Sequence, residues 1–333
     1  MSLVPSVLIH ESCWPQASAR DLLRSLRTRR IPHKFHYESY KQARQWLALH
    51  ETYSPARRDP DCRNLYDRAL SETAASWNHK SVHLLALGCG GGQKEVALLQ
   101  ELNRRNVSSL FTPQDVSLPL VLTAWQRARQ LVEAIETTEA SHDGLLCDLA
   151  GVTEPQDLLA RLRRKAIPRL VTFLGLAPNF EPHEVWPQLS EWIGEDGRLL
   201  FSANLAPGAD YEDGVRQLLP SYANDMTNRW LTLLLEDWGL ERGDGEVRWS
   251  VEPCPHGTGL LRIAADYHPI QKRRFEVEGE SVRFEPGQPW RLFFSYRHTP
   301  ECMRDIVARN GLRLINSWIT DSGEEGVFLC ERL

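Results

Sequence analysis

The residues best suited to chemistry form a glycine-rich turn, Gly88-Cys89-Gly90-Gly91-Gly92, directly after the apolar run 82–87. A continuous apolar run of this length is typical of a strand buried on both faces of a parallel sheet. Glycines at the carboxyl end of such a strand let the backbone approach a ligand closely. Asp115 and Asp148 stand at the ends of the next two predicted strands. Neighbouring strand ends therefore offer backbone and carboxylate groups to one ligand.

Two common ligand classes fit this turn poorly. A phosphate-binding P-loop needs a Gly-Lys pair followed by Ser or Thr, whereas here the chain continues Gly92-Gln93-Lys94-Glu95. A dinucleotide site needs a third glycine three residues after the second, and Gln93 occupies that position. Glu95 at the start of the following helix also disfavours a pyrophosphate.

A third class, S-adenosylmethionine (SAM), carries no phosphate. It needs a glycine turn beside its methionine part and a carboxylate for its ribose hydroxyls. Asp115, 27 residues after Gly88, stands where that carboxylate belongs. Asp148 would accept a hydrogen bond from the adenine amino group, and Lys94 would meet the carboxylate of the cofactor. The sequence therefore favours a SAM site, with Gly88 and Gly90 in the turn.

The segments around the turn alternate between strand and helix patterns up to residue 204. Short apolar runs alternate with stretches whose apolar residues recur at helical spacing. We expect strands at 82–87, 109–115, 145–147, 170–174 and 198–203, and helices at 94–104, 118–132, 155–164 and 183–192. This order predicts right-handed βαβ units and an α/β fold with a doubly wound, mostly parallel, Rossmann-like sheet.

The alternation stops after residue 204. Residues 1–60 are polar and irregular, with one helical pattern at 19–29. The later part predicts a helix at 228–238, antiparallel strands within 246–284 (such as 260–267 and 274–282), a helix at 300–310, and strands at 312–318 and 326–331. We predict a SAM-binding domain of residues 60–204 plus 299–333. A second α+β substrate-binding lobe would consist of residues 1–59 plus 205–298.

The composition is that of a globular protein and argues against several functions. The 333 residues carry a net charge of −5, with a pI of about 6.1, so no basic field exists to hold nucleic acid. No apolar run approaches the roughly 20 residues that span a bilayer, and the first residues lack a signal-peptide pattern. The seven cysteines include no CxxC pair, and no HExxH motif is present. We expect a cytoplasmic monomer without a metal cofactor, a nucleic-acid partner or a membrane partner.

Several stretches resemble the histidine-specific SAM-dependent methyltransferase family. They are PHKFHYES, ETYSPARRD, LALGCGGGQKE, PQDVS, CDL, FLGLAPNFEP and the segment from Phe294 to Cys330. The resemblance implies a Rossmann-like methyltransferase domain that binds SAM. It implies cofactor contacts at Gly88, Lys94, Asp115, Asp148 and Leu149. It also implies substrate contacts at Tyr37, Tyr53, Asn179 and Ser295, with Tyr222 as a looser match.

One position departs from the family pattern. In the family's histidine Nα-methyltransferase, a glutamate binds the imidazole of the substrate. This glutamate stands two residues before the serine that matches Ser295. Here that residue is Phe293. A benzyl group cannot accept a hydrogen bond from an imidazole N–H, so histidine is disfavoured as the substrate. Phe293 would instead line an apolar acceptor pocket. The expected substrate is another small amino acid or a related amine.

Methyl transfer from a sulfonium is an in-line displacement, so the enzyme must hold an unprotonated acceptor behind the methyl group. Asn179 follows the fourth predicted strand, where its amide oxygen could accept from a substrate amine. The amine could lose its proton directly to solvent, or through Tyr53 and a water. The sequence leaves two other functions open: a catalytically silent protein of the same fold that binds SAM or a small molecule, and methylation of a protein target.

Overall fold

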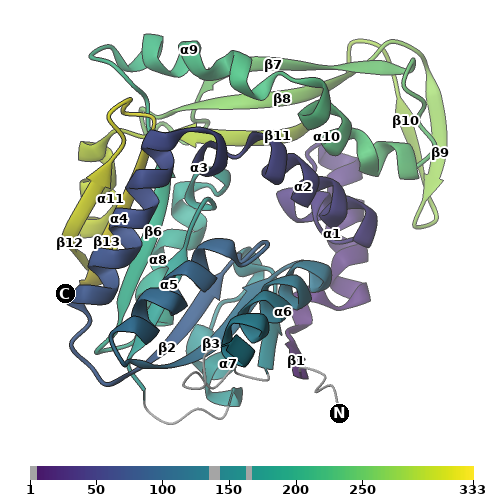
Figure 1. Ribbon diagram of the computed structural model, residues 1–333. Helices are drawn as coiled ribbons and strands as arrows, with labels where there is room; N and C mark the ends of the chain where they lie inside the picture. Colours follow the sequence, from purple (N-terminus) through teal and green to yellow (C-terminus); the bar gives the residue numbers. More distant parts are fainter. Residues whose placement is uncertain (1–5, 135–142, 163–166) are drawn as a thin grey trace.

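The computed structural model of the chain describes residues 6–134, 143–162 and 167–333. Its centre is an eight-stranded sheet in the order β1-β4-β3-β2-β5-β6-β13-β12 (Figure 1). In that order the strands are Ser6–Ile9, Asp143–Leu146, Ser108–Asp115, Ser81–Leu87, Arg169–Phe173, Arg198–Asn204, Glu325–Arg332 and Leu312–Ile319. Neighbouring strands from β1 to β6 pair in parallel, and β13 runs antiparallel to β6 and β12. The predicted α/β fold with a doubly wound, mostly parallel sheet is confirmed.

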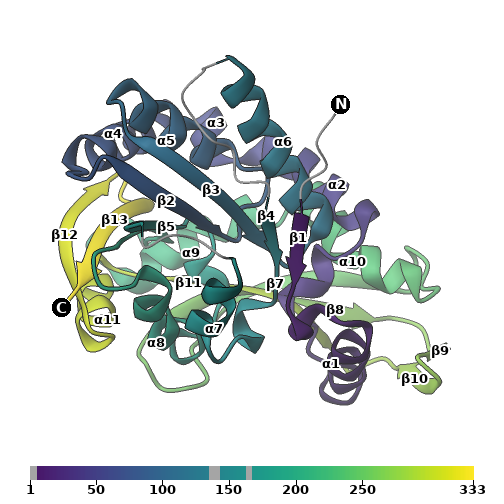
Figure 2. The same ribbon diagram turned by 90° about the horizontal axis from the view of Figure 1, so that it is seen from below.

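Helices cover both faces of this sheet (Figure 2). One face carries α4 (Pro60–Ser76), α5 (Gln93–Arg104) and α6 (Leu118–Ala134); the other carries α7 (Pro155–Arg161), α8 (Pro182–Ile193) and α11 (Pro300–Arg309). In β2, Leu84 and Ala86 face the first group, whereas Leu85 and Leu87 face the second. The apolar run is continuous because successive side chains of a strand point to opposite faces and both faces are covered.

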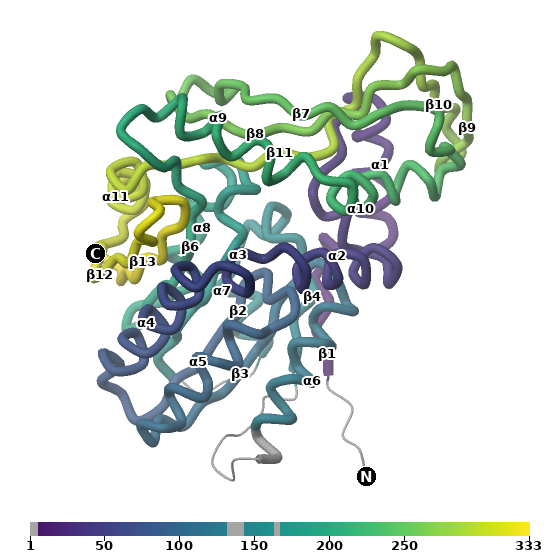
Figure 3. The backbone as a smooth tube through the Cα atoms, turned by 45° about the horizontal axis from the view of Figure 1, so that its top comes forward, coloured from purple at the N-terminus to yellow at the C-terminus, as the bar shows by residue number. Residues whose placement is uncertain are grey.

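A second body lies across the top of the molecule in Figures 1 and 3. Its antiparallel sheet has the order β11-β8-β7 and is accompanied by the hairpin β9–β10. The strands are β7 (Gly245–Pro253), β8 (Leu261–Pro269), β9 (Arg273–Val277), β10 (Glu280–Phe284) and β11 (Trp290–Arg297). The helices are α1 (Pro15–Thr28), α2 (Tyr40–Tyr53), α9 (Tyr211–Tyr222) and α10 (Asp225–Asp237), with the short α3 (Pro55–Arg58) leading to α4. Residues from α1, α10, β8 and β11 share one apolar core, rich in aromatic rings.

Short 3₁₀ turns complete the described chain. They are η1 (Glu11–Cys13), η2 (His33–His36), η3 (Leu149–Gly151) and η4 (Ala177–Asn179). Within the residues described, no helix has both the length and the apolar character that crossing a membrane requires.

The N-terminal segment differs from the prediction in two places. Residues 6–9, which were not predicted to be a strand and were placed in the second lobe, form the edge strand β1 and pair with β4. Four residues carry too little periodicity to reveal a strand. Residues 40–53, predicted to be irregular, form α2, which begins with a capping box between Ser39 and Gln42. The division of the remaining chain into two domains stays a prediction.

Two further differences lie in the antiparallel part and in α7. The predicted strand 274–282 is two strands joined by a tight turn, because Glu278 and Gly279 both adopt positive φ angles, of 51° and 76°. Two consecutive residues with positive φ match the right-handed twist of a hairpin. The predicted helix 155–164 begins as expected, and its last two residues lie outside the described part of the chain.

Candidate active site

A cavity of about 740 Å³ opens at the carboxyl edge of the parallel sheet, near the switch point between β2 and β5. This is where open α/β sheets bind ligands, and the volume is within the range of small-molecule sites, roughly 300–1,000 Å³. Its floor comes from the ends of β2, β3, β4 and β5, and its opposite wall from η2, α2, β8 and β11. Eight of the predicted site residues line it: Tyr37, Gly88, Gly90, Lys94, Asp115, Asp148, Leu149 and Asn179.

Gly90 and Gly92 illustrate why this turn is built from glycine. Gly90 has a φ angle of 51°, and a Cβ added there would lie 2.7 Å from the ring of Trp46. Gly92 has a φ angle of 70°, and an added Cβ would lie 2.8 Å from the backbone of Ala124 in α6. Positive φ is costly for residues with a side chain. The turn is therefore pressed between α2 and α6, with its backbone toward the cavity.

Asp115 is held in place by the backbone. Its Oδ2 accepts a hydrogen bond from Gly90 N at 3.0 Å, and its Oδ1 accepts one from Ser117 N at 3.0 Å. Burial raises the pKa of Asp115 to about 6, against the opposing effect of these backbone donors. Each oxygen keeps a second lone pair, so the carboxylate can still accept two hydroxyl groups from a ligand.

Gln114 fixes three strand ends relative to one another. Its Oε1 accepts from Gly88 N at 2.9 Å, and its Nε2 donates to Cys147 O at 2.7 Å. These bonds join the ends of β2, β3 and β4. The sequence analysis did not single out this residue, although its place beside Asp115 in PQDVS was a signal.

Asp148 is tied to the N-terminal segment by an ion pair. Its Oδ2 lies 3.0 Å from Nζ of Lys34, a buried lysine of η2, and its Oδ1 accepts from Ala150 N at 3.1 Å. The same Lys34 Nζ lies 2.6 Å from Asp21 Oδ2. Burial alone would lower the pKa of Lys34, but the two carboxylates outweigh it and the net shift is upward. Lys34, which the sequence analysis missed, thus links the cofactor side of the cavity to the second body.

Lys94 reaches the cavity from the first turn of α5. Its Nζ lies 3.7 Å from the centre of the Tyr66 ring, and Tyr66 donates its hydroxyl to Glu325 at 2.5 Å. Burial lowers the pKa of Lys94, while Glu325 and Glu95 oppose that effect. Among the described residues, no carboxylate lies within ion-pair distance of its Nζ. A carboxylate on a ligand would supply the missing counter-charge.

Two residues face the cavity from the acceptor side. Asn179 ends η4, in the loop that follows β5, and Tyr37 follows η2. The Tyr37 ring packs against Trp46 and Trp230, with centroids 5.7 Å and 5.3 Å away. Burial raises the pKa of Tyr37 far above its ordinary value, with a smaller contribution from Asp115. Its hydroxyl therefore remains protonated and can donate a hydrogen bond.

Four predicted residues do not line the cavity: Tyr53, Tyr222, Phe293 and Ser295. The Tyr53 side chain is exposed at the end of α2, with the guanidinium of Arg58 over its ring at 5.6 Å. The Tyr222 hydroxyl lies 3.2 Å from Ser295 Oγ, and Asn204 Nδ2 donates to both. This network joins α9, β6 and β11.

A bulge in β11 explains why Phe293 turns away. Arg291 pairs with Asp266 and Phe293 with Ala265, so Leu292 has no partner in the ladder. The extra residue reverses the alternation beyond it, and Phe294, not Phe293, shares the cavity face with Arg291. The Phe293 ring is buried instead, with centroids 4.9 Å from His33 and 6.2 Å from Trp230. It does not line an apolar acceptor pocket as predicted.

Paired charges form much of the wall opposite the glycine turn. Arg291 binds Glu252 through two hydrogen bonds of 2.6 and 2.9 Å, and it binds Asp266 at 2.6 Å. Arg262 binds Glu252 at 2.8 Å and Glu181 at 2.9 Å. These residues come from segments distant in the sequence, and only Glu181, within FLGLAPNFEP, belonged to one of the short stretches that resemble the family.

Comparison with known proteins identifies the class to which this fold and site belong. A sequence profile described as "Histidine-specific methyltransferase, SAM-dependent" matches residues 18–332, nearly the whole chain. The protein is a SAM-dependent methyltransferase and its cofactor is SAM. It belongs to the histidine-specific methyltransferase family. A comparison with curated proteins gives no match.

Solved methyltransferase structures are similar at low identity. The magnesium protoporphyrin IX methyltransferase of Synechocystis PCC 6803, with bound S-adenosylhomocysteine (SAH), is 14% identical, over 88% of this chain and 95% of that chain, with a TM-score of 0.42. The 1,6-didemethyltoxoflavin-N1-methyltransferase of Burkholderia thailandensis is 10% identical, over 91% and 90% of the two chains, with a TM-score of 0.42. At these values the similarity carries no argument about substrate.

Proposed function

We propose that the enzyme methylates the amino group of a small amino acid or a related amine other than histidine. One observation carries the proposal: a single cavity joins the glycine turn to Asn179 and Tyr37. A cofactor held at the turn and a small acceptor held by these two side chains would therefore share one enclosed space. Such an arrangement brings the two reactants together and limits the access of water.

The residues on the cofactor side suit SAM, which supplies a methyl group on a positively charged sulfur. Asp115 would accept from the two ribose hydroxyls through its free lone pairs. Lys94 would pair with the methionine carboxylate. Asp148 would accept from the adenine amino group beside its ion pair with Lys34, and the buried Leu149 would pack against the adenine ring. The glycine turn leaves room for the methionine part.

On the acceptor side, Asn179 and Tyr37 have complementary roles. The Asn179 amide oxygen would accept from the substrate amine and direct its lone pair toward the methyl group. The protonated Tyr37 hydroxyl would donate to an oxygen of the substrate, such as a carboxylate. The proton released by the amine would pass to solvent, since Tyr53 lies outside the cavity. Tyr222 and Ser295 would support the wall through their network with Asn204.

The position of Phe293 argues against histidine. Its ring is 8% exposed and lies among aromatic side chains, including Trp249 and Tyr222 at centroid distances of 6.1 and 6.3 Å. Position 293 therefore supplies no carboxylate to an acceptor, so the imidazole-binding glutamate of the histidine enzyme has no counterpart at this position. A buried imidazole N–H without a partner costs about 1–3 kcal/mol.

A screen for methyl transfer tests this proposal. The protein is incubated with methyl-labelled SAM and a panel of amino acids and amines that includes histidine. We expect at least one acceptor to be methylated, and histidine more slowly than that acceptor. Methylation of histidine above all other acceptors would contradict the proposed substrate class. SAM binding without transfer to any panel member would favour the catalytically silent alternative, and transfer only to added proteins would favour a protein target.

Asn179→Ala sharpens the test. It should lower kcat/KM for the acceptor by about tenfold, the effect of one hydrogen bond in the transition state, and leave the Kd of SAM unchanged. Asn316→Ala, an exposed residue of β12, is the matched control. An unchanged kcat/KM in the Asn179 variant would remove this residue from the acceptor site.

A further inference from the structure

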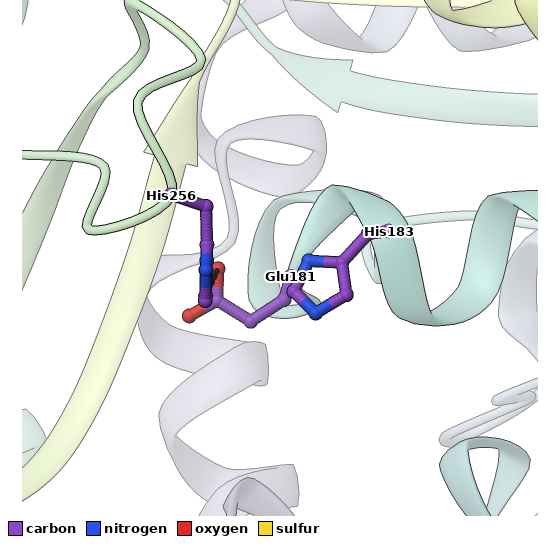
Figure 4. Close-up of side chains that lie close together, drawn as sticks. All are labelled: Glu181, His183 and His256. Carbon is purple, nitrogen blue, oxygen red and sulfur yellow. Dashed lines mark ion pairs between the residues drawn. The ribbon is translucent and has the colours of Figure 1, made fainter.

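Three side chains of types that can bind a metal ion stand together at one side of the cavity, apart from the cofactor residues. Glu181 precedes α8, His183 lies in its first turn, and His256 comes from the loop between β7 and β8 (Figure 4). One ligand atom from each residue lies within 4.8 Å of the other two. All three residues also line the cavity. Segments some seventy residues apart in the sequence therefore bring two imidazoles and a carboxylate together.

We propose that Glu181, His183 and His256 form a binding site for a divalent transition-metal ion. Two imidazole nitrogens and one carboxylate oxygen are a donor set used by Zn²⁺, Co²⁺, Ni²⁺ and Fe²⁺. Ligand bonds of about 2.0–2.2 Å require the donor atoms to approach one another more closely than 4.8 Å. The two histidines are exposed, so rotation of their side chains can close that gap.

The carboxylate of the site is held in position by its neighbours. Arg262 donates to Glu181 Oε1 at 2.9 Å, and Tyr296 donates its hydroxyl to Oε2 at 2.5 Å. His256 Nε2 lies 3.7 Å from the same Oε2. An oxygen has two lone pairs, so Oε2 can accept from Tyr296 and still bind a cation. Ligating carboxylates in metal sites commonly have such hydrogen-bonded support.

The charge around the cluster permits a cation. Arg262 places a positive charge beside Glu181, but Glu252 also binds that arginine, at 2.8 Å. Glu184 adds a further carboxylate, close enough to both histidines and to Glu181 to interact with them electrostatically. Glu252 is shared with Arg291, which also pairs with Asp266. The four carboxylates Glu181, Glu184, Glu252 and Asp266 therefore outnumber the two guanidinium groups of Arg262 and Arg291.

Three protein ligands leave coordination positions open on the metal. Because the cluster lines the cavity, such a position can take an oxygen or nitrogen donor from a molecule bound there. In the proposed function this donor would be a group of the acceptor other than the methylated amine, since a coordinated amine no longer has a free lone pair. Only this last step rests on the proposed function; metal binding itself does not.

Direct titration with Co²⁺ tests the site. The protein is produced without a polyhistidine tag, stripped with a chelator and desalted, then titrated at pH 7.5 by calorimetry and by visible absorption. We expect one equivalent to bind, without a sulfur-to-cobalt charge-transfer band. His183→Ala and His256→Ala should each weaken binding at least tenfold, and the double variant should lose it. His79→Ala, an exposed histidine distant from the cavity, should bind like the wild type.

Three results would overturn the proposal: no saturable binding by the wild type, the same isotherm for the wild type and the double variant, or a sulfur-to-cobalt band that assigns the metal to cysteine. Calorimetric titration with SAH serves as the folding control, because the double variant should retain the wild-type affinity. The metal result is independent of methyl transfer, so a failed acceptor screen and a failed metal titration remain distinguishable.

Discussion

The two sides of the cavity are built in different ways. On the cofactor side, all candidate residues except Lys94 lie at or just after the end of a parallel strand, and Lys94 lies in the first turn of α5. Backbone groups hold the strand ends together: Gly90 N donates to Asp115, and Cys89 N donates to the Gln114 carbonyl. On the acceptor side, the wall comes from η2, α2, β8 and β11, and side-chain contacts hold it. The contacts of Arg291 with Glu252 and Asp266 are the densest example.

This difference has a consequence for how each side responds to substitution. Backbone hydrogen bonds depend on the fold and survive most side-chain changes. Ion pairs and aromatic packing depend on the side chains themselves, so a single replacement, for example at Arg291, would alter the shape and charge of the wall. We infer that the chain can change its acceptor while keeping its cofactor site.

The largest expected effect is on the cofactor side. Asp115→Ala should remove two charge-assisted hydrogen bonds to the ribose, worth roughly 1.5–3 kcal/mol each, and so weaken SAM binding by more than about 100-fold. Calorimetric titration with SAM or SAH measures the change.

Asp196→Ala, an exposed residue next to Gly197, is the matched control and should bind SAM normally. Because Gly90 N would lose its acceptor, the thermal unfolding of the Asp115 variant is measured alongside. A folded variant with wild-type affinity would contradict the cofactor assignment and the contrast between the two sides.

The cofactor side was open to prediction because strand ends in a parallel sheet meet at one edge. The apolar run before Gly88, together with Asp115 and Asp148 at the ends of later strands, was enough to place these three residues around one cavity. The βα alternation likewise predicted the sheet. The family resemblance added Leu149 and Tyr37, neither of which local pattern alone distinguishes from an ordinary core residue.

The acceptor side was less open to prediction for a physical reason. The orientation of Phe293 depends on a one-residue bulge at Leu292, and nothing in the local apolar pattern reveals a bulge. The pairing of Lys34 with Asp148 depends on how η2 folds over the sheet, a contact between residues more than a hundred positions apart. Strand β1 was missed because it is only four residues long.

A matched pair of variants tests the two faces of β11. Phe293→Ala should lower the free energy of unfolding by about 3–5 kcal/mol, the usual cost of removing a buried phenylalanine. Phe294→Ala should cost less stability because its ring is only half-buried, and it should raise the KM for the acceptor several-fold because that ring lines the cavity. Chemical denaturation and steady-state kinetics measure the two effects.

The reverse pattern of effects would show that β11 has no bulge at Leu292. If Phe293→Ala raised the acceptor KM with little loss of stability while Phe294→Ala chiefly destabilised the fold, Phe293 would face the substrate. The Kd of SAM should stay constant in both variants, since β11 contributes nothing to the strand ends that hold the cofactor.

The smallest expected effect is a pH dependence confined to the cofactor side. Burial raises the pKa of Asp115 to about 6, so the carboxylate that accepts the ribose hydroxyls is ionised at pH 7.5 and about nine-tenths protonated at pH 5. SAH affinity should therefore be full above pH 7 and fall by up to about tenfold as the pH drops through 6. On the acceptor side, burial lowers the pKa of His33 to about 3 and that of His50 to about 4, so both stay neutral over this range.

Calorimetric titrations from pH 5 to 7.5 measure the profile, with circular dichroism to confirm folding at each pH. The Asp115→Asn variant, whose amide does not titrate between pH 5 and 7.5, should give a flat pH profile at lower affinity. A flat profile in the wild type as well would mean that the ligand does not contact the Asp115 carboxylate or that its pKa lies near the ordinary value.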